Sequence, residues 1–362
     1  MGVLSALAIL ALLIVVHEAG HFFAAVWQGI RVTSFNVGFG PVLLERRSRG
    51  IQFALRAIPL GGYVAFPDDD PDSGFDPKDP DLLKNRSVFQ RAIVISAGVL
   101  ANLLLAWAVL CAQGIVVGIP AGFNAGSGVL VVALQPDGAA AKAGLEAGDL
   151  VVAMGGKTLG AGTKAVQQLV DAVKTSPNQA LLLGIERNGI GKNLELVPAN
   201  MGGSGRIGAQ LQPDGNELFR RASNPLEILQ QAKTEFVQIL RRTISGFVAL
   251  ATNFGETAPQ ISGPVKIVEM GAKLAHQGGG SLFLFTALIS VNLAVLNSLP
   301  LPMLDGGQFL LLLLEGLRGK PLPERLQLAF TQSGLLLLLG LSAVLIVKDT
   351  SQLAFVRQLL LR

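Results

Sequence analysis

The stretch VVHEAGHFFAAVWQGI, residues 15–30, places two histidines and a glutamate inside an otherwise apolar run. On a helix, His17 and His21 are one turn apart on one face, so both imidazoles can reach one metal ion. Glu18 then lies beside the ion, where a carboxylate can take a proton from water and pass it to a leaving amine. This H-E-x-x-H pattern suits a hydrolytic zinc site. The alternative is a pair of neutral histidines buried between helices, which leaves the charge of Glu18 to be neutralised in an apolar setting.

A hydrolytic zinc site needs a third protein ligand and an open position for water. The remaining histidine, His276, falls outside the third apolar stretch described below. The segment NSLPLPMLDGGQ, residues 297–308, offers Asp305 instead, in backbone that Pro300 and Pro302 make irregular. Irregular backbone at membrane depth is tolerated only when protein buries it or when it lines a wet cavity. The alternative role for the Asp305 carboxylate is that of an N-cap for the helix that follows.

The composition indicates a membrane protein. Half of the 362 residues are hydrophobic and only 15% are charged, which is unusually apolar for a soluble globular protein. The net charge is only +4 and the basic residues form no long run interleaved with aromatic residues, so we expect no nucleic-acid partner. The single cysteine, Cys111, excludes an internal disulfide framework and a multi-cysteine metal site.

Four apolar stretches are candidates for membrane-spanning helices. They cover residues 2–30, 92–119, 281–301 and 333–347. The last stretch is short, and residues 326–329 can extend it. Because Arg31 is the first basic residue of the chain, the first stretch lacks the basic start of a cleaved signal peptide, and we expect it to be retained as a span.

The basic residues orient these spans. The loop from 31 to 91 is rich in arginine and lysine, whereas no basic residue follows the second span until Lys142. By the positive-inside rule, this loop lies in the cytoplasm, and residues 120 to about 280 lie outside together with both termini. Spans one and three then both run inward, which puts the H-E-x-x-H pattern and Asp305 at similar depths.

Between spans two and three, the composition changes to that of a soluble module. Strands are predicted at 126–134, 149–157, 179–187 and 192–198, with helices at 139–149 and 163–175. This succession, with the turn in AGLEAGDLVVAMGGK, resembles a PDZ domain, which we assign to residues 120–215. Two uses for it remain open: binding of an extended peptide in its groove, and steric exclusion of bulky ectodomains.

The predicted fold is an α-helical polytopic membrane protein with about four transmembrane helices and one inserted PDZ-like α+β domain. Residues 1–119 hold spans one and two, and residues 281–362 hold spans three and four. Residues 216–280 mix charged and apolar side chains at helical spacing, so we expect an amphipathic helical region on the membrane surface. The acidic loop at 67–81 is expected to be flexible and solvated, with a gate or a secondary cation site as the alternative.

The sequence resembles the site-2 protease family of intramembrane zinc metalloproteases, in its bacterial branch with a PDZ domain. The resemblance rests on HEAGH in the first span and NSLPLPMLDGG in a late one. It extends through VGFGP at 37–41, IPLGGYVAF at 58–66, SAGVLAN at 96–102, ISGPVKI at 261–267 and EGLRGKPLPERLQ at 315–327. It implies a membrane-embedded β-hairpin at 58–66, Zn²⁺ held by His17, His21 and Asp305, and Glu18 as the general base.

The same resemblance implies contacts with a substrate. Asn297 is expected to hold the substrate backbone or the developing oxyanion. Asn102 is a further candidate, although its segment has Val99 where the family usually has proline. A strand edge for the substrate is expected at Gly61, Gly62, Tyr63 and Val64.

The implied partner is a transmembrane protein substrate, already cut by another protease and cleaved within or next to its membrane helix, as in the regulated proteolysis of anti-sigma factors. Membrane lipid is the other expected partner. The expected location is the bacterial plasma (inner) membrane, with a thylakoid or plastid membrane as the alternative. Two other functions compete. A non-catalytic adaptor would use only the PDZ domain, and a metal transporter would need acidic or histidine residues in spans two and four, which offer almost none.

Overall fold

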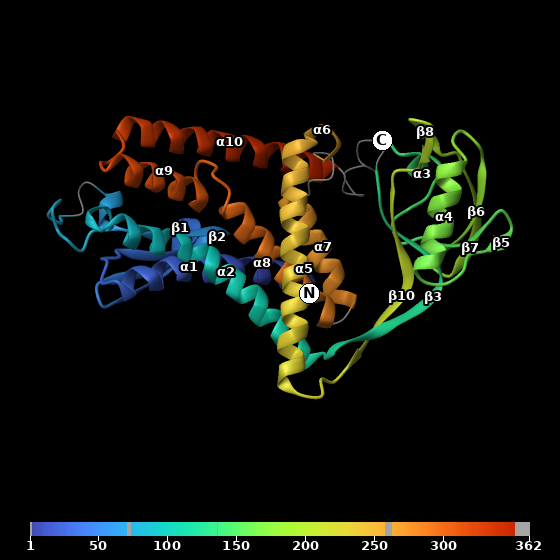
Figure 1. Cartoon of the computed structure of the whole chain (residues 1–362), viewed down its shortest axis with the longest axis horizontal. Coiled ribbons are helices and arrows are strands. Elements are labelled where there is room, and N and C mark those ends of the chain that lie inside the picture. Colours follow the sequence, from blue (N-terminus) through green and yellow to red (C-terminus); the bar gives the residue numbers. More distant parts are fainter. Residues whose placement is uncertain (1, 71–73, 136, 258–262, 278, 352–362) are drawn as a thin grey trace. The chain divides into compact units, whose positions relative to one another are not determined.

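The computed structural model describes residues 2–70, 74–135, 137–257, 263–277 and 279–351 (Figure 1). The chain divides into two compact units. Unit 1 joins Met1–Gly118 to Arg221–Arg362, and unit 2 is the inserted segment Ile119–Arg220.

Among the described residues, four helices of unit 1 are long and apolar enough to cross a membrane. They are α1 (Gly2–Trp27), α2 (Val88–Val116), α8 (Gly279–Asn297) and α10 (Glu324–Ser351). These helices confirm the four predicted spans. The third helix ends at Asn297 rather than at Leu301, because Pro300 and Pro302 cannot continue a helix.

The helix α2 packs against both α1 and α8 (Figure 1). A capping box starts it: Ser87 Oγ accepts a hydrogen bond from the Gln90 backbone N–H, and the Gln90 side chain accepts one from the Ser87 backbone N–H. A Cβ at Gly20 of α1 would overlap the carbonyl oxygen of Ala97 on α2. Glycine at position 20 therefore allows the two helices to approach closely.

The sheet of unit 1 contains β1 (Ser34–Ser48) and β2 (Ile51–Ala65). Both strands bend and pair in two registers, since Phe35 lies opposite both Phe53 and Val64. The first half of β1 thus lies between the two halves of β2, and residues 62–65 form an edge among the described strands. The hairpin predicted at 58–66 is wrong in its bounds: residues 58–65 belong to β2 alone, and the hairpin is formed by β1 with β2, whose bent halves make a sheet of four segments. The Phe22 ring of α1 packs edge-on against Phe35 and Phe53, which holds the sheet on α1.

Among the described residues, unit 1 has four further α-helices: α5 (Pro225–Thr252), α6 (Phe254–Thr257), α7 (Pro264–Gln277) and α9 (Asp305–Arg318). Residues 216–220, which were expected at the start of the amphipathic helical region, extend a strand of unit 2 instead. The helix α5 begins only at Pro225, where the Asn224 side chain accepts from the backbone N–H of Glu227. Of the ISGPVKI segment, residues 261 and 262 lie outside the described residues.

Unit 2 is an antiparallel sheet with helices, of α+β type. Its strands are β3 (Ile119–Leu134), β4 (Leu150–Met154), β5 (Lys157–Thr158), β6 (Leu181–Arg187), β7 (Ile190–Leu196), β8 (Ala199–Met201), β9 (Ser204–Arg206) and β10 (Ala209–Arg220). The main sheet has the order β10-β3-β4-β6-β7. The helices are α3 (Ala139–Lys142) and α4 (Thr163–Thr175). The apolar residues of these strands and helices share one buried core, which includes Val129, Val151, Leu169 and Ile185.

One ion pair is buried at the edge of that core. The Asp149 side chain is only 1% exposed and accepts hydrogen bonds from Arg187 at 2.6 and 2.7 Å. It also accepts from the backbone N–H of Glu146. Burial raises the pKa of the Asp149 carboxyl, but these hydrogen bonds outweigh burial and hold its pKa below the ordinary value. The pair therefore stabilises unit 2 in the charged state of Asp149.

Replacing Asp149 by asparagine should destabilise unit 2 by about 1–3 kcal/mol, because Arg187 loses its buried carboxylate partner and keeps only that of the exposed Glu146. Because the folded-state pKa lies below the unfolded value of about 3.9, wild-type unit 2 has this contribution at neutral pH and loses it as the pH falls below about 4. The Asp149→Asn variant should not show this loss of stability at low pH. Hydrogen exchange of β4 and β6 amides in the full-length protein in detergent measures both effects. Asp171→Asn, on the exposed face of α4, is the control, and an equal effect of the two variants would contradict the prediction.

Candidate metal centre

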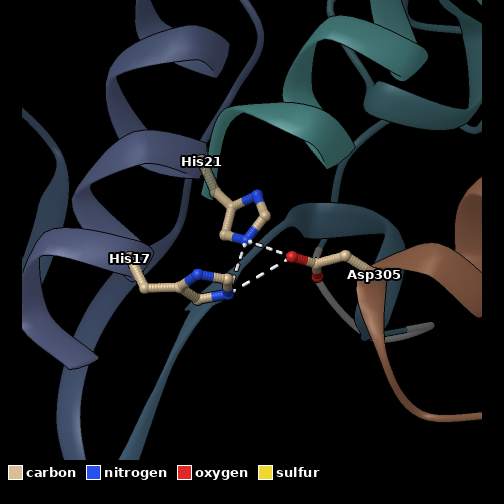
Figure 2. A group of neighbouring side chains, drawn as sticks. All are labelled: His17, His21 and Asp305. Atoms are coloured by element: carbon tan, nitrogen blue, oxygen red, sulfur yellow. Dashed lines mark hydrogen bonds and ion pairs between the residues drawn. The ribbon is translucent and has the colours of Figure 1, made fainter. Parts of the chain in front are cut away.

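His17 and His21 project from one side of α1, and Asp305 faces them from the first turn of α9 (Figure 2). The two Nε2 atoms are 3.3 Å apart. Asp305 Oδ2 lies 3.3 Å from His17 Nε2 and 3.5 Å from His21 Nε2. In the part of the chain that the structure describes, no other cluster of histidine, cysteine and acidic side chains has this arrangement. Three predicted ligand residues from opposite ends of the sequence thus meet at one point.

The spacing of these three atoms fits a zinc ion. Tetrahedral zinc with ligands at about 2.0–2.1 Å separates its ligand atoms by about 3.3–3.4 Å, close to the three observed distances. Asp305 Oδ2 is buried without a hydrogen-bond donor, although buried carboxylate oxygens are nearly always satisfied. A cation between the three atoms would supply the missing partner.

The helix α2 controls the orientation of both imidazoles. His21 Nδ1 lies 2.8 Å from the carbonyl oxygen of Val94, which can only accept, so the ring proton is on Nδ1 and the Nε2 lone pair faces Asp305. His17 Nδ1 lies 3.3 Å from the side-chain amide of Asn102. Partners of this kind fix the tautomer and the ring position of histidine ligands.

Gly98 of α2 leaves the space that the two rings occupy. A Cβ at this position would overlap His21 Nε2 and lie 2.8 Å from His17 Cε1. Val94, Gly98 and Asn102 recur every four residues and therefore lie on one stripe of α2. No role was predicted for Val94 or Gly98 from the sequence. A glycine in the middle of an apolar span, four residues before an asparagine, is the signal that could have indicated this stripe.

The turn between α8 and α9 places Asp305. The sequence predicts irregular backbone at this residue, but Asp305 is the first residue of α9, and its N-cap is Leu304, without a side-chain capping bond. The alternative role of Asp305 as N-cap is therefore wrong, which leaves its carboxylate for the histidines. Added Cβ atoms at Gly306 and Gly307 would overlap carbonyl groups of the preceding turn, so these glycines let α9 start close to it.

Glu18 lies between the metal centre and the sheet edge. The backbone N–H of Val64 donates to its carboxylate, and a Cβ at Gly62 would lie 3.1 Å from Glu18 Cγ. Within the sheet, the carbonyl of Ala65 accepts from Thr33, so the alternation along β2 turns the backbone groups of Gly62 and Val64 outward. The strand edge at residues 62–65 therefore adjoins Glu18, and the Val64 N–H on this edge already donates to the Glu18 carboxylate.

The other residues that were predicted to contact the substrate differ in their positions. Asn297 is partly exposed, and its Nδ2 lies 3.4 Å from His17 Nε2, so it can reach a bound carbonyl group. Gly61 and Tyr63 instead pack against Phe39. Asn102 is fully buried. The direct substrate contact that the sequence resemblance implied for Asn102 does not fit this position.

An apolar cavity of about 720 Å³ lies between α2, α5, α6 and α8. Its lining includes Leu103, which follows Asn102, and Ser298 and Leu299, which follow Asn297. An apolar ligand in this cavity would therefore contact residues that directly follow, in the sequence, the two asparagines near His17.

Comparison with known proteins gives one consistent group. The profile of peptidase family M50 matches residues 5–341. A protein of Nostoc sp. and one of Synechocystis sp., both named as zinc metalloproteases, are each 48% identical; they cover 98% and 99% of this chain and 97% of their own lengths. The chloroplastic membrane metalloprotease ARASP of Arabidopsis thaliana is 42% identical over 99% of this chain and 81% of its own length.

Among solved structures, the PDZ domain of an SdrC-like protein from Listeria monocytogenes matches 23% of this chain and 86% of its own. The sequence identity is 22% and the TM-score is 0.21. A match at this score carries no argument about unit 2, whose fold rests on its own strands, helices and core.

Gly98→Ala should weaken zinc binding about 10–100-fold, the range seen when groups around metal-bound histidines are disturbed, because the added methyl displaces the His21 ring. Zinc retained per chain after dialysis against a chelator measures this effect.

Two glycine variants serve as controls for Gly98→Ala. Gly340→Ala adds a methyl group to α10 where no atom lies within 4 Å. Gly114→Ala adds one to α2 against Ile228, away from the histidines. Zinc retention by Gly98→Ala equal to that of both controls would show that the site does not need this space.

Proposed function

The chain belongs to peptidase family M50, the site-2 protease family, and on that premise we propose that it hydrolyses a peptide bond within or next to the membrane helix of another protein. It is a membrane zinc metalloprotease by family and by its apolar helices. The observation that carries the proposal is the convergence of His17, His21 and Asp305 beside Glu18, on helices α1 and α9.

In this proposal, His17, His21 and Asp305 hold the metal, and a tetrahedral ion keeps one position open. Zinc bound there supplies Lewis acidity, which polarises a carbonyl group and makes water acidic enough to attack near neutral pH. Glu18 is not among the three ligands, so its carboxylate is free to take a proton from the attacking water and deliver it to the leaving amine nitrogen. The Asn297 amide donates to the carbonyl oxygen as negative charge develops on it.

The substrate must lose its helical hydrogen bonds before a peptide carbonyl becomes accessible. The outward backbone groups of Gly62 and the outward carbonyl of Val64 can replace some of these bonds by accepting the unwound segment as an added strand. The cavity lined by Leu103 and Leu299 offers an apolar surface to the side chains of the unwound substrate segment. These features support a membrane-embedded peptide as the substrate.

We propose that unit 2 lies outside the membrane and selects substrates, as a PDZ domain would. Its separate core supports an independently folded module. As a size filter, unit 2 would exclude substrates with bulky ectodomains, and its deletion would let the enzyme cut them. As a peptide receptor, it would bind trimmed substrates, and its deletion would slow their cleavage. Cleavage of one membrane helix carrying a long or a short ectodomain, by enzyme with and without unit 2, distinguishes the two roles.

The proposed substrate is a single-pass protein that another protease has already trimmed outside, and a membrane-anchored anti-sigma factor is one protein of this type. Basic residues in the loop 31–91 support an orientation in which the product is released into the cytoplasm. The proposed location is the bacterial plasma membrane. The alternative, a thylakoid or plastid membrane, draws support from the cyanobacterial and chloroplastic relatives.

The test measures zinc per chain and cleavage of a model transmembrane substrate in detergent, for wild type, Glu18→Gln and Asp305→Ala. We expect Glu18→Gln to keep its zinc and to lose cleavage by at least about 10²-fold, because it removes the general base. Asp305→Ala should lose both zinc and cleavage. Turnover by Glu18→Gln at the wild-type rate would refute the role of Glu18. Full zinc occupancy in Asp305→Ala would move the third ligand elsewhere, and a wild type without zinc would favour the adaptor.

A further inference from the structure

Asn102 is a buried polar side chain at the metal centre for which the proposed reaction has no use. It lies on α2 and is fully buried. Its backbone carbonyl accepts a hydrogen bond of 2.7 Å from Ser290 Oγ of α8, which fixes its position between helices. Its side-chain Nδ2 lies 3.3 Å from His17 Nδ1, while its Oδ1 is buried with no hydrogen-bond donor.

The position of the proton on the His17 ring determines whether Asn102 must donate a hydrogen bond to Nδ1 or accept one from it. A neutral imidazole carries its proton on only one of its two nitrogens. His17 Nε2 faces Asp305 and His21, so it can bind a metal ion only when its lone pair is free and the proton is on Nδ1. An Nδ1–H group requires an acceptor, and Oδ1 is the side-chain atom of Asn102 that can accept.

A half-turn of the Asn102 amide satisfies both groups. The oxygen and nitrogen ends of an amide have nearly the same shape, so their exchange hardly changes the packing. The exchange places Oδ1 against His17 Nδ1 and gives the unpaired oxygen a donor. The opposite orientation, with Nδ2 donating to Nδ1, belongs to the tautomer that has its proton on Nε2, and this tautomer cannot bind a metal ion through Nε2.

We propose that Asn102 is a positioning residue that accepts a hydrogen bond from His17 Nδ1–H and thereby presents Nε2 to zinc. The proposal rests on the proposed function as a zinc protease. It gives His17 the same kind of support that the Val94 carbonyl gives His21. One helix, α2, then supplies an acceptor to each histidine of α1, and the matching four-residue spacing of Gly98 from both acceptors leaves room for the rings between them.

Two variants separate the acceptor from the volume of the side chain. Asn102→Leu keeps a side chain of similar size and removes the acceptor. Asn102→Asp keeps an acceptor at the same position and removes the amide donor. We expect Asn102→Leu to weaken zinc binding about 10–100-fold, as loss of the partners of metal-bound histidines does. Asn102→Asp should bind zinc at least nearly as tightly as wild type.

The measurement is the zinc affinity of the full-length protein in detergent, by competition with a chromophoric chelator, with the thermal midpoint of the metal-free protein as a check on folding. Gln113→Leu is the matched control. Gln113 is another buried amide of α2 with an unpaired oxygen, and its replacement should leave zinc affinity unchanged.

A substrate contact by Asn102 gives different results. It predicts that Asn102→Leu raises KM and leaves zinc affinity unchanged, and that Asn102→Asp, which lacks the amide donor, behaves like Asn102→Leu. Wild-type zinc affinity in Asn102→Leu overturns the positioning role, as does an equal loss of zinc affinity in folded Asn102→Asp. Because the readout is zinc binding, a wild type that binds no zinc refutes the proposed function. A wild type that binds zinc and cleaves, with Asn102→Leu unaffected, refutes only the role of Asn102.

Discussion

The dominant constraint on this structure is the cost of placing two imidazoles and two carboxylates among apolar helices. In such surroundings each polar atom needs a partner, because water cannot satisfy it. Helix α2 provides partners for the two imidazoles through the Val94 carbonyl and the Asn102 amide. Glycines at the helix contacts, such as Gly98, let the backbones and rings approach closely enough. The ionisable groups thus determine how α1, α2 and α9 pack.

The sequence predicted the parts of this centre that depend on local spacing. His17 and His21 follow from the helical repeat, and Glu18 follows from its place between them. Asp305 was predicted from depth, since the basic residues orient spans one and three in the same inward direction. The support from Val94 uses a backbone carbonyl, for which no side chain gives a signal. The role of Asn102 depends on which face of α2 meets α1, and hydrophobic periodicity is uninformative in a helix that is apolar all round.

The strands show a different limit of sequence reasoning. A hairpin was expected at 58–66, but residues 58–65 continue the strand β2, and β1 pairs with both halves of it. Only this long-range register reveals which half of β2 forms the edge near Glu18. In unit 2, the end of β10 carries the charged residues Glu217 and Arg220, a pattern that fits an amphipathic helix as well as a strand. Pairing with β3 decided the outcome, as tertiary context often does for short segments.

The separation of the metal ligands along the chain has a consequence for biosynthesis. His17 and His21 enter the membrane with the first helix, whereas Asp305 follows the third span. A ribosome-bound chain that has inserted α1 and α2 already carries the H-E-x-x-H pattern, yet it lacks the carboxylate that completes the ligand set. With the proposed ligand set, a nascent or prematurely terminated chain would lack one of the three metal ligands, and peptide cleavage would begin only after nearly the whole chain has been inserted.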